Sequence, residues 1–245
     1  MTEKSNLQPQ LRRVGVDGLL VTFGDRLSEA ANRAALAFRA AIESADLPGC
    51  EETSTSLTST YLRFDPLACP HARIEADLQA LIASQDWYAA PLPRGRRLWY
   101  IPTVFGTDLA PQLDEAAAMA GMSPEEAIRS ISETRVRVQT IGFAAGQPYL
   151  GELPAEWDIP RQTSLTAKVP VGALTVAIRQ LVLFAVSTPT GWRHIGQTAF
   201  RAFRPESNTP FVLSPGDEVL FEQISPETYH AMPAGEDGAR WEKLS

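Results

Sequence analysis

The stretch "TRVRVQTIGF", residues 134–143, decides the fold of the second half of the chain. Val136 and Val138 alternate with Arg137 and Gln139, and this period of two is typical of a half-buried β-strand. Further segments that favour strands follow at short intervals: "AKVPVGALTVAI" (167–178), "LVLFAVS" (181–187) and "DEVLFEQI" (217–224). Many strands with few helices between them predict a β-barrel or a β-sandwich for this half.

The first half has a different pattern, in which helical and strand-like segments take turns. The expected order is strand, helix, two strands and helix, over residues 14–23, 28–44, 52–57, 60–64 and 71–84. In the last segment Ile74, Leu78, Leu81 and Ile82 fall on one face of a helix. This order predicts a small split-βαβ unit with its helices on one face of an antiparallel sheet.

A link rich in proline, glycine and arginine, residues 90–97, separates the two patterns and is a reasonable domain boundary. We therefore expect an α/β domain over residues 1–93, a β-barrel domain over residues 94–228 and a polar C-terminal tail over residues 229–245. The tail is expected to be loosely ordered unless Trp241 docks it against the barrel.

Two helices are expected at the start of the second half. The first lies within "LAPQLDEAAAMAG", residues 109–121, and ends on Gly121, a residue that favours a left-handed C-cap. The second begins at "SPEE", where Ser123 is the expected N-cap and Glu126 stands three positions later. This spacing predicts a capping box.

The composition excludes several classes of protein. The net charge of −7 opposes a dedicated nucleic-acid surface, because phosphate binding requires a basic field. The polar N-terminus lacks the apolar core of a signal peptide, and no stretch reaches the roughly 18 apolar residues of a membrane span. Cys50 and Cys69 are too few for a disulfide framework and lack the spacing of a zinc site. We expect a cytoplasmic protein without a metal.

Signatures of self-sufficient catalysis are missing from the sequence. It contains no phosphate-binding G-x-x-x-x-G-K-[ST], no G-x-S-x-G elbow and no H-E-x-x-H. The histidines are His71, His194 and His230, which leaves little material for a catalytic triad. Local motifs alone indicate a soluble α+β protein of two domains.

One segment concentrates residues that shape the backbone. "TIGFAAGQPYLGELP", residues 140–154, holds several glycines and prolines beside two aromatic residues. Helices avoid such a mixture, and strands tolerate it only at their ends. Two interpretations fit: a surface loop, or a loop whose backbone closely approaches a ligand or a partner.

An ordered set of motifs in the second half identifies a family. The segment above is followed by "IPRQTS" (159–164), "KVPVGALTVAIRQ" (168–180), "TPTGWRHIGQT" (188–198) and "LSPGDEVLF" (213–221). Taken together, GF-x-x-G-x-PYLG and GWR-x-IG resemble the family of allophanate hydrolase subunit 1, which includes the B subunit of 5-oxoprolinase and the sporulation-kinase inhibitor KipI. The resemblance runs from about Val16 to Phe221.

The resemblance implies a fold and a partner. It implies a small ferredoxin-like N-terminal domain followed by a cyclophilin-like β-barrel domain, hence an α+β fold class. It also implies a subunit 2 of related barrel fold, with which this chain would couple ATP hydrolysis to opening or carboxylating a small amide-type substrate. The ATP would be shared with that partner. The alternative function within the family is a KipI-like inhibitor that binds a sensor histidine kinase.

The resemblance also suggests site residues, each with a structural alternative. Arg161 could bind a carboxylate or phosphate, or form a surface salt bridge, and Gln180 could hydrogen-bond an amide; we take both as the catalytic candidates. The substrate-binding candidates are Gly142, Phe143, Gly146, Pro148, Tyr149, Trp192 and Arg193. The glycines would let the backbone approach a ligand, and the aromatic residues would wall a pocket. The same loop could instead form a barrel corner, and Trp192 could lie in the core.

The chain departs from the family pattern at several of these positions. Where the family typically reads GG-x-QTGIYP, this chain has "AIRQLVLFAV" (177–186), and "LPGFPYL" has become "AAGQPYL" (144–150). The second arginine usually found after "PR" is replaced by Thr166, and His194 stands where relatives carry an aliphatic residue. If glycines at the positions of Ile178 and Arg179 make room for a ligand, the larger residues fill that room, and little 5-oxoprolinase activity is expected.

Overall fold

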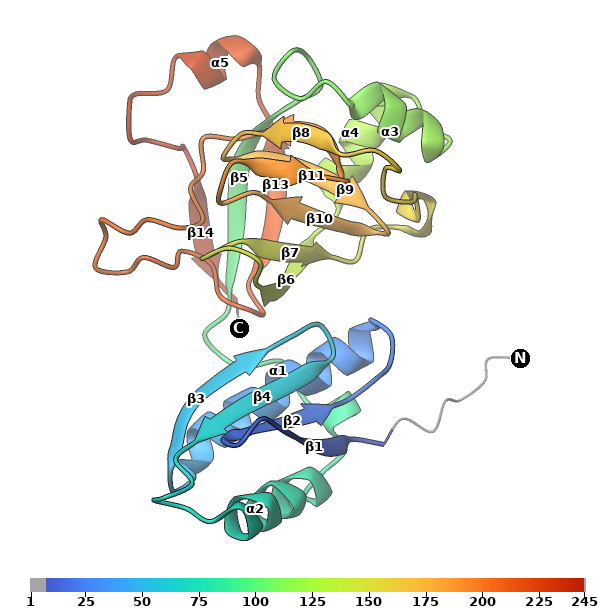
Figure 1. The fold of residues 1–245 in the computed structure, drawn as a ribbon. Coiled ribbons are helices and arrows are strands. Elements are labelled where there is room, and N and C mark those ends of the chain that lie inside the picture. Colours follow the sequence, from blue (N-terminus) through green and yellow to red (C-terminus); the bar gives the residue numbers. More distant parts are fainter. Residues whose placement is uncertain (1–7, 245) are drawn as a thin grey trace. The chain divides into compact units, whose positions relative to one another are not determined.

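The computed structural model describes residues 8–244, which divide into two compact units between Arg94 and Gly95 (Figure 1). The fold is α+β, as predicted, with a ferredoxin-like unit of sheet and helices and a cyclophilin-like β-barrel unit. Each unit has its own hydrophobic core.

The first unit is an antiparallel sheet packed against helices. Its strands lie in the order β1-β2-β4-β3, with bounds Gln10–Val14 (β1), Gly18–Thr22 (β2), Ser59–Phe64 (β4) and Cys50–Thr55 (β3). The helices are α1 (Glu29–Ala45), α2 (His71–Ala83) and the short 3-10 turn η1 (Trp87–Ala89). This arrangement is the predicted split-βαβ unit.

The helix α1 forms and packs as its sequence directs. The side chain of Ser28 caps it by accepting a hydrogen bond from the backbone N–H of Ala31. Its apolar stripe, which includes Phe38 and Ile42, is buried against β3 and β4. Phe38 meets Phe23 and Trp87 edge to face, with ring centroids 5.3 and 5.0 Å apart, so these aromatic residues fill the centre of the core.

The prediction of one strand over residues 14–23 is wrong. Gly15 adopts a φ of 67°, and the chain reverses there, so that β1 and β2 form a hairpin. A Cβ on Gly18 would lie 2.5 Å from the carbonyl oxygen of Val14, so a glycine is required for this close approach. The strand β1 takes the sheet edge that a strand after α2 would take in a ferredoxin-like βαββαβ order.

The second unit is a closed barrel. Within residues 95–244, its strands follow the order β12-β9-β10-β7-β6-β13-β5, and β12 returns to pair with β5. Their bounds are Arg193–Gln197 (β12), Ala173–Ala177 (β9), Gln180–Leu183 (β10), Pro148–Gly151 (β7), Val136–Ile141 (β6), Glu218–Gln223 (β13) and Arg97–Phe105 (β5). Only β5 and β13 run parallel in this ring; the other pairs are antiparallel.

The alternation read in the sequence determines which side chains fill the barrel. Val136 and Val138 are fully buried in its core, beside Leu150, Leu181 and Phe221. Besides β14 (Arg240–Lys243), two further strands lie outside the ring and pair with each other: β8 (Thr166–Val169) and β11 (Thr188–Thr190). The 3-10 turn η2 (Ala155–Trp157) lies between β7 and β8.

Helices α3 (Leu113–Met119) and α4 (Pro124–Glu133) follow β5, and α4 packs against β13. The predicted capping box is present: Ser123 Oγ accepts from the N–H of Glu126 at 3.2 Å, and Glu126 accepts from the N–H of Ser123 at 2.8 Å. Gly121 has the predicted positive φ, 72°, beyond the end of α3. None of the helices within residues 8–244 combines the length and the apolar character that a membrane crossing demands.

The segment expected as a loosely ordered tail is ordered. It contains the end of helix α5 (Pro226–His230) and strand β14 (Arg240–Lys243), which pairs with β5. Trp241 packs on Trp99, with ring centroids 6.2 Å apart, and lies under the Arg97 guanidinium at 5.7 Å. The Trp241 contacts and the pairing of β14 with the free edge of β5 therefore hold this segment in an ordered conformation.

Candidate functional site

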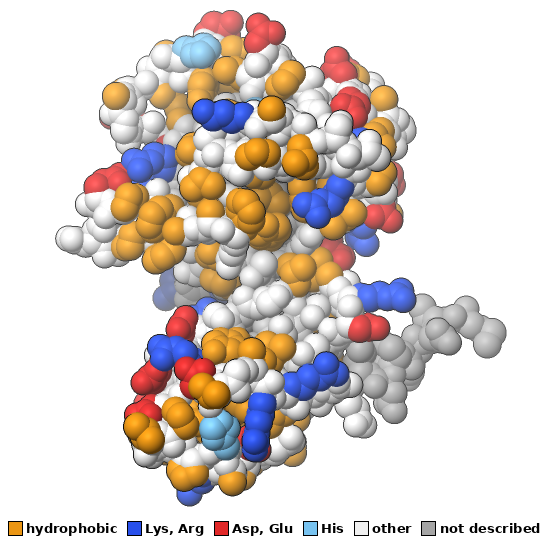
Figure 2. Space-filling model, in the orientation of Figure 1, with side chains coloured by type: hydrophobic (Ala, Val, Ile, Leu, Met, Phe, Trp, Pro, Cys, Tyr) orange, Lys and Arg blue, Asp and Glu red, His pale blue; other side chains and the backbone are white. Residues whose placement is uncertain are grey.

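A small open hollow of about 140 Å³ lies on the outer side of the barrel strands β7 and β10. Polar and apolar atoms share its surface about equally, and it is lined by Phe143, Gln147, Tyr149, Arg161, Leu165, Val182, Phe184, Pro189, Thr190, Gly191 and Trp192. Hydrophobic side chains gather on the face of this unit that carries β8 to β11 (Figure 2). The hollow is smaller than the roughly 300–1,000 Å³ pockets of drug-sized ligands, so its size suits a small metabolite.

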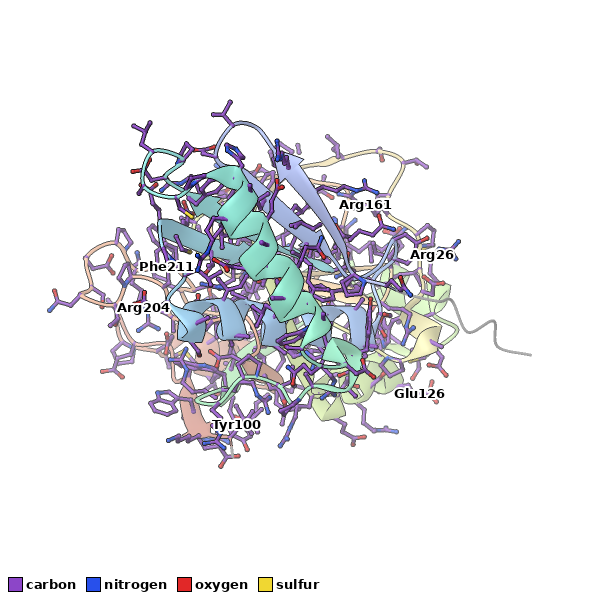
Figure 3. The ribbon with its side chains drawn as sticks, turned by 90° about the horizontal axis from the view of Figure 1, so that it is seen from below. Arg26, Tyr100, Glu126, Arg161, Arg204 and Phe211 are labelled. Atoms are coloured by element: carbon purple, nitrogen blue, oxygen red, sulfur yellow. The ribbon has the colours of Figure 1, made fainter. Side chains whose placement is uncertain are left out.

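An arginine and a tryptophan define one side of the hollow. The Cζ atom of Arg161 lies 5.6 Å from the centroid of the Trp192 ring, and Tyr149 meets the same ring edge to face at 6.3 Å. Arg161 extends from the exposed loop before β8 (Figure 3). Among the residues that the structure describes, no carboxylate pairs with its guanidinium. The salt bridge that was the structural alternative for Arg161 is therefore not formed within residues 8–244.

Hydrogen bonds of the half-buried Gln162 hold the Arg161 loop in place. The backbone N–H of Gln162 donates to the carbonyl of Gly191 at 2.7 Å, and its Nε2 donates to the carbonyl of Trp192 at 3.1 Å. Its Oε1 accepts from Gln112 Nε2 at 2.8 Å. Gln162, the residue next to Arg161, thus links this loop to the segment that carries Trp192.

Arg193 lies outside the hollow, although the sequence pointed to it as a substrate-binding residue. Its side chain is buried, donates to the carbonyl of Pro160 at 2.6 Å and pairs with Glu115 at 2.8 Å. These contacts join α3 to the residue preceding Arg161. Arg193 therefore supports the loop that carries Arg161 and does not line the hollow.

Gln180 also lies outside the hollow, so the two predicted catalytic residues do not meet there. Its Nε2 donates to Gln139 Oε1 at 2.8 Å, and both side chains are buried. The pair crosses β7 at Gly151, where a Cβ would lie 2.8 Å from Gln139 Oε1. Gly151 thus serves the packing of this amide pair.

The glycine-rich loop joins β6 to β7, and its residues divide between wall and scaffold. Phe143 lines the hollow with a φ of 68° and is 74% exposed. Gly146 packs on the segment before Phe203, because a Cβ there would lie 2.8 Å from the Cβ of Phe203. Gly142 is held by a hydrogen bond from its N–H to the carbonyl of Gln147, and Pro148 is buried at the start of β7. The loop therefore forms a barrel corner at Gly142, Gly146 and Pro148, while Phe143 faces the hollow; the approach of its backbone to a ligand stays a prediction.

Ile178 and Arg179, the positions expected to fill a ligand site, lie away from this hollow. They form the two-residue turn between β9 and β10, with φ values of 45° and 60°, and neither lines the hollow. Positive φ at both positions is the geometry of a type I′ hairpin turn, which favours glycine or asparagine. Arg179 donates to the carbonyl of Leu153 at 3.0 Å. Small residues here would relax the backbone, and the steric argument against 5-oxoproline binding does not apply to this hollow.

Sequence reasoning missed several lining residues, chiefly Gln147, Leu165, Val182, Phe184 and Thr190. A signal existed for one of them: Gln147 is the polar residue that stands where the family pattern carries phenylalanine. The other residues belong to strands or loops whose outward faces cannot be assigned before the barrel closes.

Titratable groups take no part in lining the hollow, apart from Tyr149 and Arg161. His194, two residues after Trp192, is buried on β12, and burial lowers its pKa, while contacts with Gly196 and Gln197 oppose part of this shift. Within residues 8–244, no group of His, Cys, Asp and Glu side chains is arranged to hold a metal ion.

Comparisons with known proteins agree with this architecture. Residues 9–213 match the model of the carboxyltransferase domain, subdomain C and D. The chain is 32% identical to the B subunit of 5-oxoprolinase from Bacillus subtilis (strain 168) over 91% of its own length and 95% of that protein. The crystal structure of TTHA0988 matches with a TM-score of 0.71 and 29% identity, over 88% of this chain and 40% of that one.

The fold also recurs in a much larger enzyme. The K. lactis urea amidolyase matches over 100% of this chain and 17% of that one, with a TM-score of 0.74 and 15% identity, a likeness that concerns the fold alone. The chain spans less than half of the solved structures TTHA0988 and urea amidolyase. Because the family model and a relative above 30% identity each cover most of the sequence, the chain belongs to the carboxyltransferase-domain family that includes the B subunit of 5-oxoprolinase and allophanate hydrolase subunit 1.

Proposed function

We propose that this protein is one subunit of a heteromeric, ATP-dependent amidohydrolase that acts on a small amide. The observation that carries the proposal is the guanidinium of Arg161, which lies above Trp192 at a metabolite-sized hollow and has no carboxylate partner within residues 8–244. It occurs in a chain that aligns with nearly the full length of the B subunit of a 5-oxoprolinase. An arginine that lacks a protein carboxylate partner is suited to bind an anionic group of a ligand.

The hollow would bind and orient the substrate. Arg161 would hold a carboxylate, while Phe143, Tyr149 and Trp192 would cover the carbon skeleton and exclude water, which strengthens the ion pair. Gln180 and Arg193 would contribute indirectly. Gln180 lies in a buried amide pair that supports the strands, and the buried Arg193 side chain supports the loop through its bond to the carbonyl of Pro160. Their roles are thus those of positioning residues.

The reaction would need groups from a second subunit. Among the described lining residues there is no carboxylate, histidine or cysteine, so the hollow offers no strong general base or nucleophile. We propose that a subunit 2 of related barrel fold supplies these groups and shares the ATP. The relatives from Bacillus subtilis, Escherichia coli and Haemophilus influenzae are each one component of a 5-oxoprolinase with several subunits, in keeping with this division of labour.

Reconstitution with the partner tests the proposal. The chain is co-purified with a candidate subunit 2, and phosphate release from ATP is measured with and without 5-oxoproline and related small lactams and ureas. We expect amide-dependent ATP hydrolysis by the complex, negligible activity of the single chain, and loss of the amide dependence in Arg161→Ala. Rapid turnover by the single chain, or a stable complex that responds to none of these amides, would contradict the proposal.

A further inference from the structure

Gln147 is the most deeply buried polar side chain in the wall of the hollow. It is 1% exposed and stands at the end of the loop between β6 and β7. Its backbone is fixed from both sides, because its N–H donates to the carbonyl of Ala144 and its carbonyl accepts from the N–H of Gly142, each at 3.1 Å. The side chain is therefore held in place before any ligand binds.

One end of the Gln147 amide is used by the protein and the other is not. The N–H of Ala185 donates to Gln147 Oε1 at 3.3 Å. A backbone N–H requires an acceptor, so this contact settles which end of the amide is oxygen. Among residues 8–244, nothing accepts a hydrogen bond from Nε2. That atom is not among the fully enclosed unpaired ones, and Gln147 lines the hollow.

A donor in this position suits one kind of ligand atom. A buried amide N–H is costly to leave unpaired, so the site would favour a ligand whose oxygen accepts from it over an analogue without that oxygen. The remaining walls near it, including Val182, Phe184 and Trp192, offer apolar surface to a carbon chain. Arg161 offers a positive charge at the same hollow.

We propose that Gln147 is a specificity-determining residue, which donates from Nε2 to a carbonyl or carboxamide oxygen of a small ligand whose carboxylate binds Arg161. The ligand class is a short monocarboxylate that carries a carbonyl oxygen near its other end. The inference rests on the proposed function in taking this hollow as the substrate site. A ligand with an ammonium group is disfavoured, because no lining residue among those described carries a negative charge.

Two acids that differ in one carbonyl test the proposal on the full chain without a partner. Binding of 4-oxopentanoate and of pentanoate is measured by NMR titration. We expect the wild type to bind 4-oxopentanoate about 3- to 10-fold more tightly, the range that one hydrogen bond supplies. Gln147→Met should bring this ratio close to one. Gln147→Glu keeps an acceptor for the N–H of Ala185 but lacks the donor, and should also abolish the preference.

Two controls distinguish the effect of the Gln147 donor from a general effect of substitution and from the effect of the Arg161 charge. Gln223→Met alters an exposed glutamine on β13 and should keep the wild-type ratio. Arg161→Ala should weaken both acids alike. Equal binding of the two acids by the wild type, binding of neither, or a preference that survives in both Gln147 variants would overturn the proposal. A Gln147-dependent preference in a protein whose complex hydrolyses no amide would refute the proposed function and leave this inference standing.

Discussion

Arg161 and Trp192 meet in a cation–π contact of 5.6 Å, although they come from different loops of the barrel unit. Gln162 supports this contact, because it donates hydrogen bonds to the carbonyls of Gly191 and Trp192 and so fixes the position of the loop. The guanidinium is thus oriented by an aromatic ring and a backbone latch, with its charge left available to a ligand.

Replacement of Arg161 should separate ligand binding from stability. We expect Arg161→Ala to weaken the binding of small carboxylates at least tenfold, while the free energy of unfolding falls by about 0.5–1 kcal/mol, the value of an exposed cation–π contact. Arg161→Lys should recover only part of the affinity, since lysine lacks the planar fork. Titration and urea denaturation measure the two effects. Equal affinity in Arg161→Ala and the wild type would remove Arg161 from the site.

Loss of the Gln162 latch should act on the site through Arg161. In Gln162→Ala the loop keeps its backbone bond to Gly191 but loses the side-chain bonds to Trp192 and Gln112. We expect carboxylate binding to weaken several-fold and the indole signals of Trp192 to shift in NMR spectra. In Arg161→Ala, adding Gln162→Ala should cost little further affinity. Additive losses would show that Gln162 acts independently of Arg161.

The turn at Ile178 and Arg179 should be a site of easy stabilisation. A β-branched residue at a positive φ is strained, and asparagine tolerates that conformation. Ile178→Asn should raise the free energy of unfolding by about 1 kcal/mol without affecting ligand binding. Val171→Asn, which alters another exposed β-branched residue without a positive φ, serves as the control and should have little effect. A destabilised Ile178→Asn variant would contradict the turn assignment.

His194 should make the stability depend on pH. Burial lowers its folded-state pKa, so on acidification the unfolded chain takes up a proton first, near the ordinary histidine pKa of about 6.5. The stability that the neutral His194 contributes to the folded state is complete above that pH. It is lost as the pH falls toward the lower, folded-state pKa. Its Nε2 is buried without a partner among the described residues.

We therefore expect His194→Leu to flatten the stability curve below pH 6.5 and to raise the free energy of unfolding at pH 6 by about 1 kcal/mol, because an unsatisfied buried nitrogen is removed. Urea denaturation between pH 5 and 8 measures both quantities. His230→Gln removes an exposed histidine and should leave the slope unchanged. An unaltered slope in His194→Leu would assign the pH dependence to other groups.

Limited digestion with trypsin should cut first after Arg94. Arg94 and Gly95 are exposed, whereas Arg96 pairs with Glu218 at 2.8 Å and its carbonyl accepts from the N–H of Leu244. Mass spectrometry should find fragments that meet at this bond, and Arg94→Gln should delay the cut. First cleavage within residues 134–184 would contradict the division of the chain into separable units.

Local patterns predicted the elements well where the physics is local. The capping box of Ser123 and Glu126 needs only residues three positions apart, and the inward alternation of Val136 and Val138 needs only one buried face. The hairpin at Gly15 was missed, because its polar first strand has no apolar alternation and gains its place by pairing with β2. Strand β14 was missed for the same reason.

The sequence by itself determined the α+β fold class, the barrel half and the family, because periodicity, caps and an ordered set of motifs are written along the chain. Only the tertiary structure decided the site. Arg161 lies over the Trp192 ring, and Gln147 lines the same hollow. Gln180 bonds to a buried partner outside the hollow. The face on which a strand side chain lies depends on register and barrel closure, which are set by hydrogen bonds between segments far apart in sequence.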